Sequence, residues 1–388
     1  MFYDLNTTQT SIVESAENII RKFDDDYWLN CDLNSKFPIE FYDEIANGGW
    51  LGICMPEEFG GANLGIREAS LFLQTISNSG GGMAAASAIH MNIFGPHPIV
   101  VHGTSDQKKN WLPPLIQGKQ KTCFGITEQD SGIDTASLKT RAKKIKGGYV
   151  LNGSKIWTST AQIADKILIL ARTSEENEIK KKIDGLTLFY TDFDRNKIET
   201  REIKKMGRSA VDSNQIFIDN LEVHDEDRIG EEGKGFRYLL DSLNPERILI
   251  AAEALGIGRN ALLRAVNYAK ERVVFNRPIG KNQSIQHPLA EIWIELEAAE
   301  LLIAKAAHQY DNGENSGALA NAAKYFAAEK AYKSTTQAVV TLGGMGYAKE
   351  YHVERLLRES LIPKLAPVSS QMILNYISEK ILDLPKSY

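Results

Sequence analysis

The segment YVLNGSKIWTS, residues 149–159, differs from the rest of the chain in its residue types and in its pattern of hydrophobic residues. Its β-branched and aromatic residues are typical of a strand, whereas the regions before and after it have helical periodicity. Three similar runs follow it, KILILARTS, LTLFYTDF and NQIFIDNLEV, and turn residues such as KGG and VDSN separate these runs. We therefore expect a central antiparallel β domain, a sandwich or barrel, over residues 121–228.

Helical patterns dominate on both sides of this domain. In TQTSIVESAENIIRKF (8–23) the apolar residues fall at positions 12, 13, 16, 19, 20 and 23, which form one face of a helix. After residue 229 several long amphipathic segments are joined by short connections, a pattern typical of a helical bundle. The prediction is an α+β fold with an N-terminal helical domain (1–120), the β domain (121–228) and a C-terminal four-helix bundle (229–388).

Composition narrows the class of protein. The 388 residues are 43% hydrophobic and 24% charged, as in ordinary globular proteins. A net charge of −5 without a basic block argues against nucleic-acid binding. No apolar run approaches the roughly 18 residues of a membrane span, and the polar, acidic start does not resemble a signal peptide. These features predict a cytoplasmic protein without a membrane span.

Cysteines and histidines do not predict a metal site. Cys31, Cys54 and Cys123 are odd in number and widely spaced, so neither a disulfide framework nor a zinc ligand set is expected. His90, His97 and His102 are close in sequence, but no cysteine or carboxylate near them in the sequence completes a ligand set. A structural or solvated role is the simpler interpretation of these histidines.

Ordered motifs give a family resemblance. CFGITEQDSGID (123–134) followed by YVLNGSKIWTST (149–160) resembles the acyl-CoA dehydrogenase family. Further matches keep the family's order over most of the chain: PEEFGG (56–61), GTSDQKKNWLPPLIQG (103–118), RIGEEGKGF (228–236), ERVVFNRPIG (271–280), TLGGMGY (341–347) and VERLLRES (353–360). The resemblance implies FAD, a homotetramer, and oxidation of an acyl-CoA at its α,β bond. It also implies hydride transfer to flavin N5 and an electron-transferring flavoprotein as acceptor.

Position in these motifs implies a set of cofactor-binding residues. The expected contacts are Phe124, Ile126, Thr127, Trp157 and Ser159 from the β domain, Arg272, Phe275 and Gln283 toward a neighbouring subunit's FAD, and Gly343, Gly344, Ser369 and Gln371 near the C-terminus. Two positions depart from the pattern. Ile133 replaces a usual serine, and Val340 replaces a common glutamine, so their hydrogen bonds are unaccounted for.

The segment SLNPERILIAAEALGIG (242–258) raises the question of catalysis. Locally, Asn244 suits a helix cap, Pro245 the first helical position, and Glu246 the first turn, where an acid favours the helix dipole. In most family members the catalytic glutamate lies in a late segment, which here reads LAPVSSQ (365–371) and contains no carboxylate. The isovaleryl and long-chain branch carries its base on an earlier helix, and Glu246 occupies that position.

The same resemblance implies three substrate-binding residues. Arg247 lies beside the expected base, and Ala366 and Pro367 occupy the late segment. Proline has no backbone N–H, so Pro367 removes a donor that normally holds the thioester oxygen, and Val368 is the alternative donor. Two other functions stay open on the same scaffold. They are an oxygen-using flavoenzyme, such as an acyl-CoA oxidase, and an acyl-CoA-binding pseudoenzyme, which Ile133, Val340 and Pro367 motivate.

Overall fold

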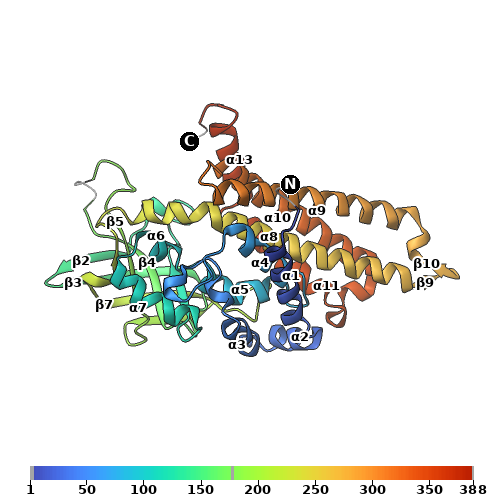
Figure 1. Cartoon of the computed structure of the whole chain (residues 1–388), viewed down its shortest axis with the longest axis horizontal. Helices are drawn as coiled ribbons and strands as arrows, with labels where there is room; N and C mark the ends of the chain where they lie inside the picture. The colour runs from blue at the N-terminus through green and yellow to red at the C-terminus, as the bar shows by residue number, and fades with distance from the viewer. Residues whose placement is uncertain (1–3, 176–178, 387–388) are drawn as a thin grey trace.

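The computed structural model describes residues 4–175 and 179–386, and it divides into helical, sheet and helical regions (Figure 1). The helices before the sheet are α1 (Thr7–Ile20), α2 (Asp25–Leu33), α3 (Ile39–Asn47), α4 (Ile66–Ser77), α5 (Gly82–Ile93), α6 (His97–His102) and α7 (Ser105–Ile116). The helices after it are α8 (Gly235–Glu271), α9 (Gln283–Asp311), α10 (Gly317–Leu342), α11 (Val353–Glu359), α12 (Ile362–Leu365) and α13 (Ser370–Lys380). The predicted fold class is confirmed. The residue numbers proposed for the domain boundaries stay a prediction.

The N-terminal helices begin where the sequence supplies caps. The Asn6 side chain accepts a hydrogen bond from the Gln9 N–H at 2.9 Å, and the Gln9 side chain accepts one from the Asn6 N–H at 3.2 Å. Thr104 and Gln107 form the same reciprocal pair at the start of α7. These caps satisfy N–H groups that have no partner within the helix and so define where the helices begin.

The central sheet is formed by strands β1 (Thr122–Gly125), β2 (Arg141–Ile145), β3 (Gly148–Ser159), β4 (Lys166–Arg172), β5 (Leu186–Asp192), β6 (Ile198–Glu202), β7 (Ser213–His224) and β8 (Arg228–Ile229). Their order is β6-β7-β3-β2-β4-β5-β8, with β1 beside β4. Most pairs are antiparallel, as expected, but β1 and β2 pair with β4 in parallel. The pairing of β3 with β7 shifts register between Lys155 and Thr158, a bulge that displaces Trp157.

Helix α8 corrects the prediction that a helix begins at Asn244 and Pro245. It runs unbroken for 37 residues from Gly235, and Pro245 lies inside it. The cost of an interior proline is offset by packing, because Leu239, Pro245 and Ile248 are all buried along this helix. Glu246 is therefore far from the first turn, and the helix-dipole explanation for this residue is wrong.

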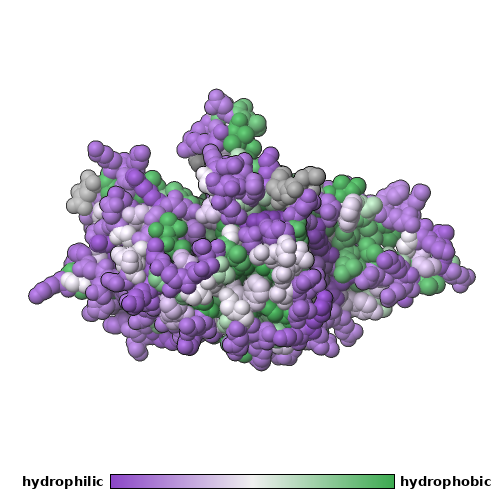
Figure 2. All heavy atoms as spheres, in the orientation of Figure 1, coloured by the Kyte–Doolittle hydropathy of each residue, from purple (hydrophilic) through white to green (hydrophobic). Residues whose placement is uncertain are grey.

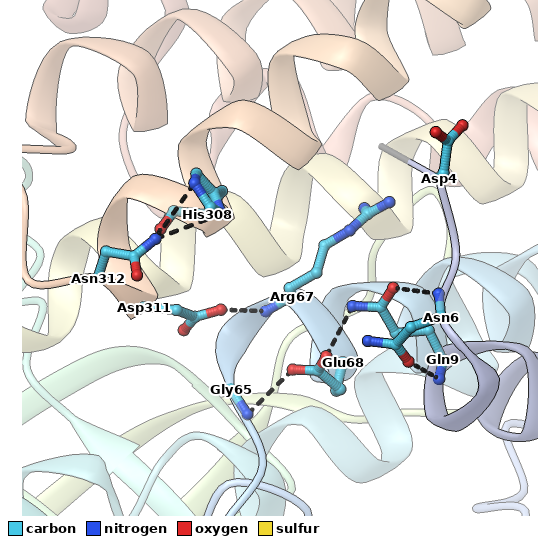
Figure 3. Close-up of a pocket in the computed structure, with 9 residues that line it drawn as sticks. All are labelled: Asp4, Asn6, Gln9, Gly65, Arg67, Glu68, His308, Asp311 and Asn312. Atoms are coloured by element: carbon cyan, nitrogen blue, oxygen red, sulfur yellow. Dashed lines mark hydrogen bonds between the residues drawn. The ribbon is translucent and has the colours of Figure 1, made fainter. Parts of the chain in front are cut away.

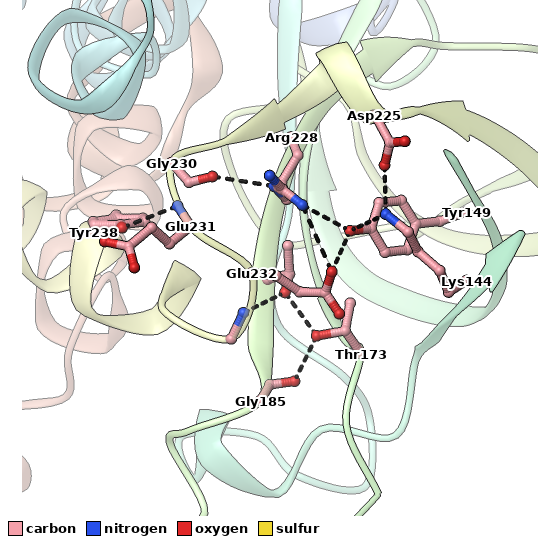
Figure 4. A network of polar contacts seen from close by, with 12 residues as sticks. Lys144, Tyr149, Thr173, Gly185, Asp225, Arg228, Gly230, Glu231, Glu232 and Tyr238 are labelled. Atoms are coloured by element: carbon pink, nitrogen blue, oxygen red, sulfur yellow. Dashed lines mark hydrogen bonds and ion pairs between the residues drawn. The ribbon is translucent and has the colours of Figure 1, made fainter. Parts of the chain in front are cut away.

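A polar network fastens the sheet to the start of α8 (Figure 4). The Tyr149 hydroxyl donates to Glu232 at 2.5 Å and accepts from Arg228 at 3.0 Å. The Tyr238 hydroxyl, on the first turns of α8, accepts from the Glu231 N–H at 3.1 Å. The approach of α8 to the sheet is thus set by side chains from both regions.

The main core is built between the two helical regions. Helix α4 packs against α8 and α9, and α10 packs against both of these helices, so α4 completes the bundle of long C-terminal helices. One continuous apolar cluster accordingly includes Phe72 of α4, Leu255 of α8 and Ile303 of α9. No helix in residues 4–175 or 179–386 combines the length and apolar character that a bilayer crossing requires.

Candidate active site

The loop after β1 is held in place by a buried ion pair. Lys155 Nζ lies 2.9 Å from Glu128 Oε1, and both side chains are almost inaccessible to solvent. The Glu128 carboxylate also accepts from the Lys139 and Thr140 N–H groups, at 2.6 and 2.9 Å. Since its oxygens are used in this way, Glu128 positions the loop that carries Ile126 and Thr127.

The predicted flavin contacts of the β domain lie close together. The Thr127 carbonyl accepts from the Ile156 N–H at 2.8 Å, which joins the β1 loop to β3. Trp157 is 57% exposed and has φ of +63°, so it is not a core residue. A bulky residue in left-handed backbone at a bulge is an unusual conformation that often marks a functional site. Ser159 and the partly buried Phe124 complete this group.

Arg208 connects this group to the helices. Its guanidinium donates to the Ser159 and Ser213 hydroxyls at 3.0 Å and to the Ser87 hydroxyl, on α5, at 3.3 Å. One turn beyond Ser87, the Nδ1 atom of His90 lies 2.7 Å from Glu253 on α8. The β-domain contacts and α8 therefore meet across α5.

Glu246 is partly buried on α8, and among the described residues none donates a hydrogen bond to its carboxyl. Burial raises the pKa of this carboxyl above its ordinary value. His90, Arg247 and Lys324 oppose that rise, whereas Glu253 adds to it. A carboxyl whose pKa is raised by burial, with cations nearby, has the properties of a general base.

Lys324 links Glu246 with the late segment. Its side chain is buried on α10, and Nζ donates to the Val368 carbonyl at 2.5 Å. Lys324 also interacts electrostatically with Arg247 and Glu246, and burial lowers its pKa to about 8. Ala366 is exposed and Pro367 is partly buried, in the same short stretch. Lys324 thus interacts both with Glu246 and with the backbone next to Pro367, and the substrate-binding role of Arg247, Ala366 and Pro367 stays a prediction. Arg247 itself donates to the Asn244 side chain at 2.9 Å.

A second group of predicted residues lies at the opposite end of the molecule. Arg272 directly follows α8, and Gln283 begins α9. Phe275 lies at the tip of the hairpin formed by β9 (Val273–Val274) and β10 (Arg277–Pro278). All three are exposed, and Phe275 is 93% exposed with φ of +52°. Figure 1 shows this hairpin at one end and β2 and β3 at the other, so one chain does not bring the two groups together.

The predicted cofactor-binding residues near the C-terminus lie in two different segments. Gly343 and Gly344 follow α10, both are exposed, and a Cβ added to either would meet nothing within 4 Å. Gly343 has φ of +62°, which favours glycine. Ser369 caps α13 by accepting from the Met372 N–H at 3.4 Å, and Gln371 is exposed on that helix. The two departures from the family pattern, Ile133 and Val340, are both exposed.

A pocket of about 490 Å³ lies elsewhere, between the N-terminus, α4 and the end of α9 (Figure 3). The Asp311 carboxylate accepts from the Ile66 and Arg67 N–H groups at 2.8 and 2.9 Å and thereby caps α4. None of the predicted site residues lines this pocket. Burial lowers the pKa of the Arg67 guanidinium although Glu300, Glu68 and Asp311 oppose this shift, and we assign the pocket a structural role.

Comparison with known proteins gives the class of the protein. Family models described as "Acyl-CoA dehydrogenase, N-terminal domain", "middle domain" and "C-terminal domain" match residues 6–119, 123–221 and 233–382. The chain therefore belongs to the acyl-CoA dehydrogenase family. It is an oxidoreductase that uses FAD and acts on acyl-CoA thioesters.

Three relatives illustrate this membership. The acyl-CoA dehydrogenase FadE12 of Mycobacterium tuberculosis is 36% identical, covering 98% of this chain and all of its own. A mitochondrial 2-methylacyl-CoA dehydrogenase of Solanum tuberosum is 31% identical, over 95% of this chain and 89% of its own. The solved structure of butyryl-CoA dehydrogenase from Megasphaera elsdenii has a TM-score of 0.92 at 30% identity, and the match covers 98% and 99% of the two chains.

The residues present fit FAD. An exposed tryptophan on a bulge, two exposed glycines with free space above them, and an almost fully exposed phenylalanine are surfaces that a large planar cofactor covers. Thr127, Trp157 and Ser159 would hold it from one chain. Arg272, Phe275 and Gln283 are exposed at the other end of the chain, and their contact with a different chain's cofactor stays a prediction.

Four residues of this site were missed in the sequence: His90 as a pairing partner, Arg208, Glu253 and Lys324. The histidine was singled out, but its carboxylate partner is 163 residues away. Glu253 and Lys324 did leave a signal, because each is a charged residue within a buried helical face. Arg208 lies in a loop, and no pattern in the sequence indicates its role.

Proposed function

We propose that Glu246 is the base that removes the α proton of an acyl-CoA thioester. The observation that carries this proposal is a carboxyl without a hydrogen-bond donor among the described residues, buried enough to raise its pKa, beside a late segment that contains no carboxylate. The α C–H next to a thioester is a very weak acid, so the base must be placed on it in a site that excludes water.

The residues around Glu246 have two further roles: they keep its carboxyl ionised and they stabilise the thioester oxygen. Arg247 and Lys324 favour the ionised carboxylate, which is the form that accepts the proton. The bound FAD would supply the acceptor for the hydride that leaves the β carbon, and Thr127, Trp157 and Ser159 would hold it. As the α proton leaves, negative charge develops on the thioester oxygen, and a backbone N–H must stabilise it. Lys324 donates a hydrogen bond to the Val368 carbonyl. We assign stabilisation of the thioester oxygen to the Val368 N–H, because Pro367 has no N–H.

The test is Glu246→Gln in the FAD-loaded protein. General-base catalysis typically contributes 10²–10⁴-fold, so we expect flavin reduction by acyl-CoA to slow by about that factor. Exchange of the substrate α hydrogen with solvent deuterium should fall in parallel, while FAD content and acyl-CoA binding stay near wild type. Glu222→Gln, on the exposed part of β7, is the control and should reduce normally. Reduction by Glu246→Gln within threefold of wild type would contradict the proposal.

We further propose a homotetramer. Two groups of predicted cofactor contacts lie at opposite ends of one chain, and a neighbouring subunit would unite them (Figure 1). Figure 2 shows an apolar area over the bundle near the hairpin end, and exposed apolar side chains of α8 and α9 include Leu263, Trp293, Ile294 and Leu301. Family membership supports an electron-transferring flavoprotein as acceptor and a role in fatty acid metabolism as parts of the same proposal. A cytoplasmic location, expected from the composition of the chain, belongs to it as well.

The alternative to a dehydrogenase is a flavoenzyme that uses oxygen, and a second experiment must distinguish the two. A monooxygenase needs no α-proton base, so the arrangement around Glu246 favours dehydrogenation. Stopped-flow reduction with an acyl-CoA, followed by reoxidation with and without oxygen, distinguishes the candidates. Fast reoxidation by oxygen would identify an oxidase, and absence of any reduction across an acyl-CoA panel would identify an acyl-CoA-binding protein without the activity.

A further inference from the structure

A buried acid–imidazole pair lies next to Glu246. His90 Nδ1 is 2.7 Å from Glu253 Oε1, and both side chains are shielded from solvent. The second carboxylate oxygen of Glu253 has no hydrogen-bond partner among the described residues. Placing such a pair in the interior is costly, so a pair at this position calls for an explanation.

The path of α5 directs this pair toward Glu246. Gly82, at the start of α5, lies against Ile257 of α8, and His90, two turns later, meets Glu253. Beyond α5 the chain continues along α8, where His102 Nε2 lies 2.8 Å from Asp241. Glu246 lies between these two contacts. It is seven residues from Glu253, almost two full turns, so both glutamates point from the same side of α8.

The charged groups around the pair come from four elements. His90 faces Glu253 and Glu246 on α8 and Arg208 from the loop before β7. Glu246 faces His90 on α5, Arg247 and Glu253 on α8, and Lys324 on α10. Burial opposes protonation of His90, but Glu253 and then Glu246 outweigh burial and raise the pKa of the imidazole. The imidazole therefore stays positively charged to a higher pH than an ordinary histidine.

We propose that His90 is a positioning residue for the reaction: its imidazolium, held by Glu253, keeps the Glu246 carboxyl ionised so that Glu246 can accept the substrate's α proton. This inference rests on the proposed role of Glu246. Glu253 fixes the ring through Nδ1, and the positive charge is thereby held on the side of α8 that carries Glu246. The net charge of the pair is zero, so its effect on Glu246 depends on the cation being the nearer member.

His90→Gln tests the proposal. Glutamine can still donate to Glu253 but carries no charge. The acid limb of the pH profile, for flavin reduction and for solvent exchange of the α hydrogen between pH 5 and 9, should move to higher pH. On that limb both rates should fall roughly tenfold, the effect of one nearby charge on an ionisation, and they should recover at alkaline pH. FAD content and melting temperature report on folding.

The double variant His90→Gln/Glu253→Gln is the matched control. It removes both charges, so its acid limb should move less than that of His90→Gln. If the profiles of both variants coincide with that of wild type while the proteins remain loaded with FAD, the pair has only a structural role and the proposal is overturned. A uniform loss of rate at every pH would equally overturn it.

A reversed pair covers the case in which His90→Gln does not fold. His90→Glu/Glu253→His keeps one acid and one imidazole but exchanges their positions. We expect the acid limb of this variant's pH profile to move to higher pH. An unchanged acid limb would contradict the proposal. The outcome is separable from that of the proposed function. If Glu246→Gln retains activity, the base assignment fails, but if it is inactive and the His90 profiles are unchanged, only this inference fails.

Discussion

At the residue scale, Ala366 has a consequence for substrate choice. It is a small, exposed residue in the late segment LAPVSSQ (365–371), which contains no carboxylate. If Glu246 on α8 is the base, as proposed, that stretch would leave more space beside the substrate's α and β carbons. The hydrogen bond from Lys324 to the Val368 carbonyl fixes the backbone two residues after Ala366.

We therefore predict that a branched or cyclic acyl-CoA is turned over about tenfold better than the straight-chain compound of equal carbon number. Each buried methylene contributes about 0.8 kcal/mol, and one such group typically gives 10–200-fold discrimination in an apolar pocket. The measurement is kcat/KM for matched pairs from about four to sixteen carbons, and Ala366→Tyr should reduce the ratio. A straight-chain preference at every length would contradict the prediction.

At the element scale, the contact between α11 and α5 has a pH dependence. Glu359 is buried on α11, and one carboxylate oxygen accepts from the Ala84 N–H at 3.1 Å. Burial raises the pKa of this carboxyl from 4.5 to about 7, although Arg355 opposes the rise. The folded state therefore binds a proton that the unfolded state has lost between these values. The contribution of Glu359 to stability falls as pH rises through that window.

Glu359→Gln should remove this dependence, because glutamine can accept from Ala84 without titrating. Relative to wild type, the free energy of unfolding of the variant should rise by about 3 kcal/mol between pH 4 and 8. Thermal melting across that range measures it, with the exposed Glu350→Gln as control. A difference from wild type that stays constant with pH would show that folding does not shift the pKa of Glu359.

Elements also show where sequence reasoning succeeded and where it stopped. The three regions were predictable because hydrophobic periodicity changes from helical to alternating near residue 121 and back near 229. The continuity of α8 was not, because Asn244 and Pro245 are strong start signals that tertiary packing overrides. Glu246 was reached through a motif, whereas its partner His90 is brought close only by folding.

At the scale of the whole molecule, the separation of the two predicted cofactor groups can be tested. Arg272→Glu should weaken FAD binding by roughly tenfold or more, as loss of a charge-assisted contact does, and should lower the tetramer content. Flavin absorbance per chain and light scattering measure the two effects. Lys143→Glu on the exposed part of β2 makes the same charge change and should alter neither. A fully loaded tetramer of the Arg272 variant would contradict the intersubunit assignment.

The unbroken course of α8 fixes a length in the assembled enzyme. Twenty-six helical steps separate Glu246 from Arg272, about 40 Å at 1.5 Å per residue. If Glu246 acts at one cofactor and Arg272 binds the cofactor of a neighbouring subunit, the length of α8 sets the distance between the two reaction centres. Insertion of a few residues in this stretch would rotate and displace one end against the other. In such an assembly the residues of the acyl pocket could change independently, whereas two subunits at once would constrain the length of α8.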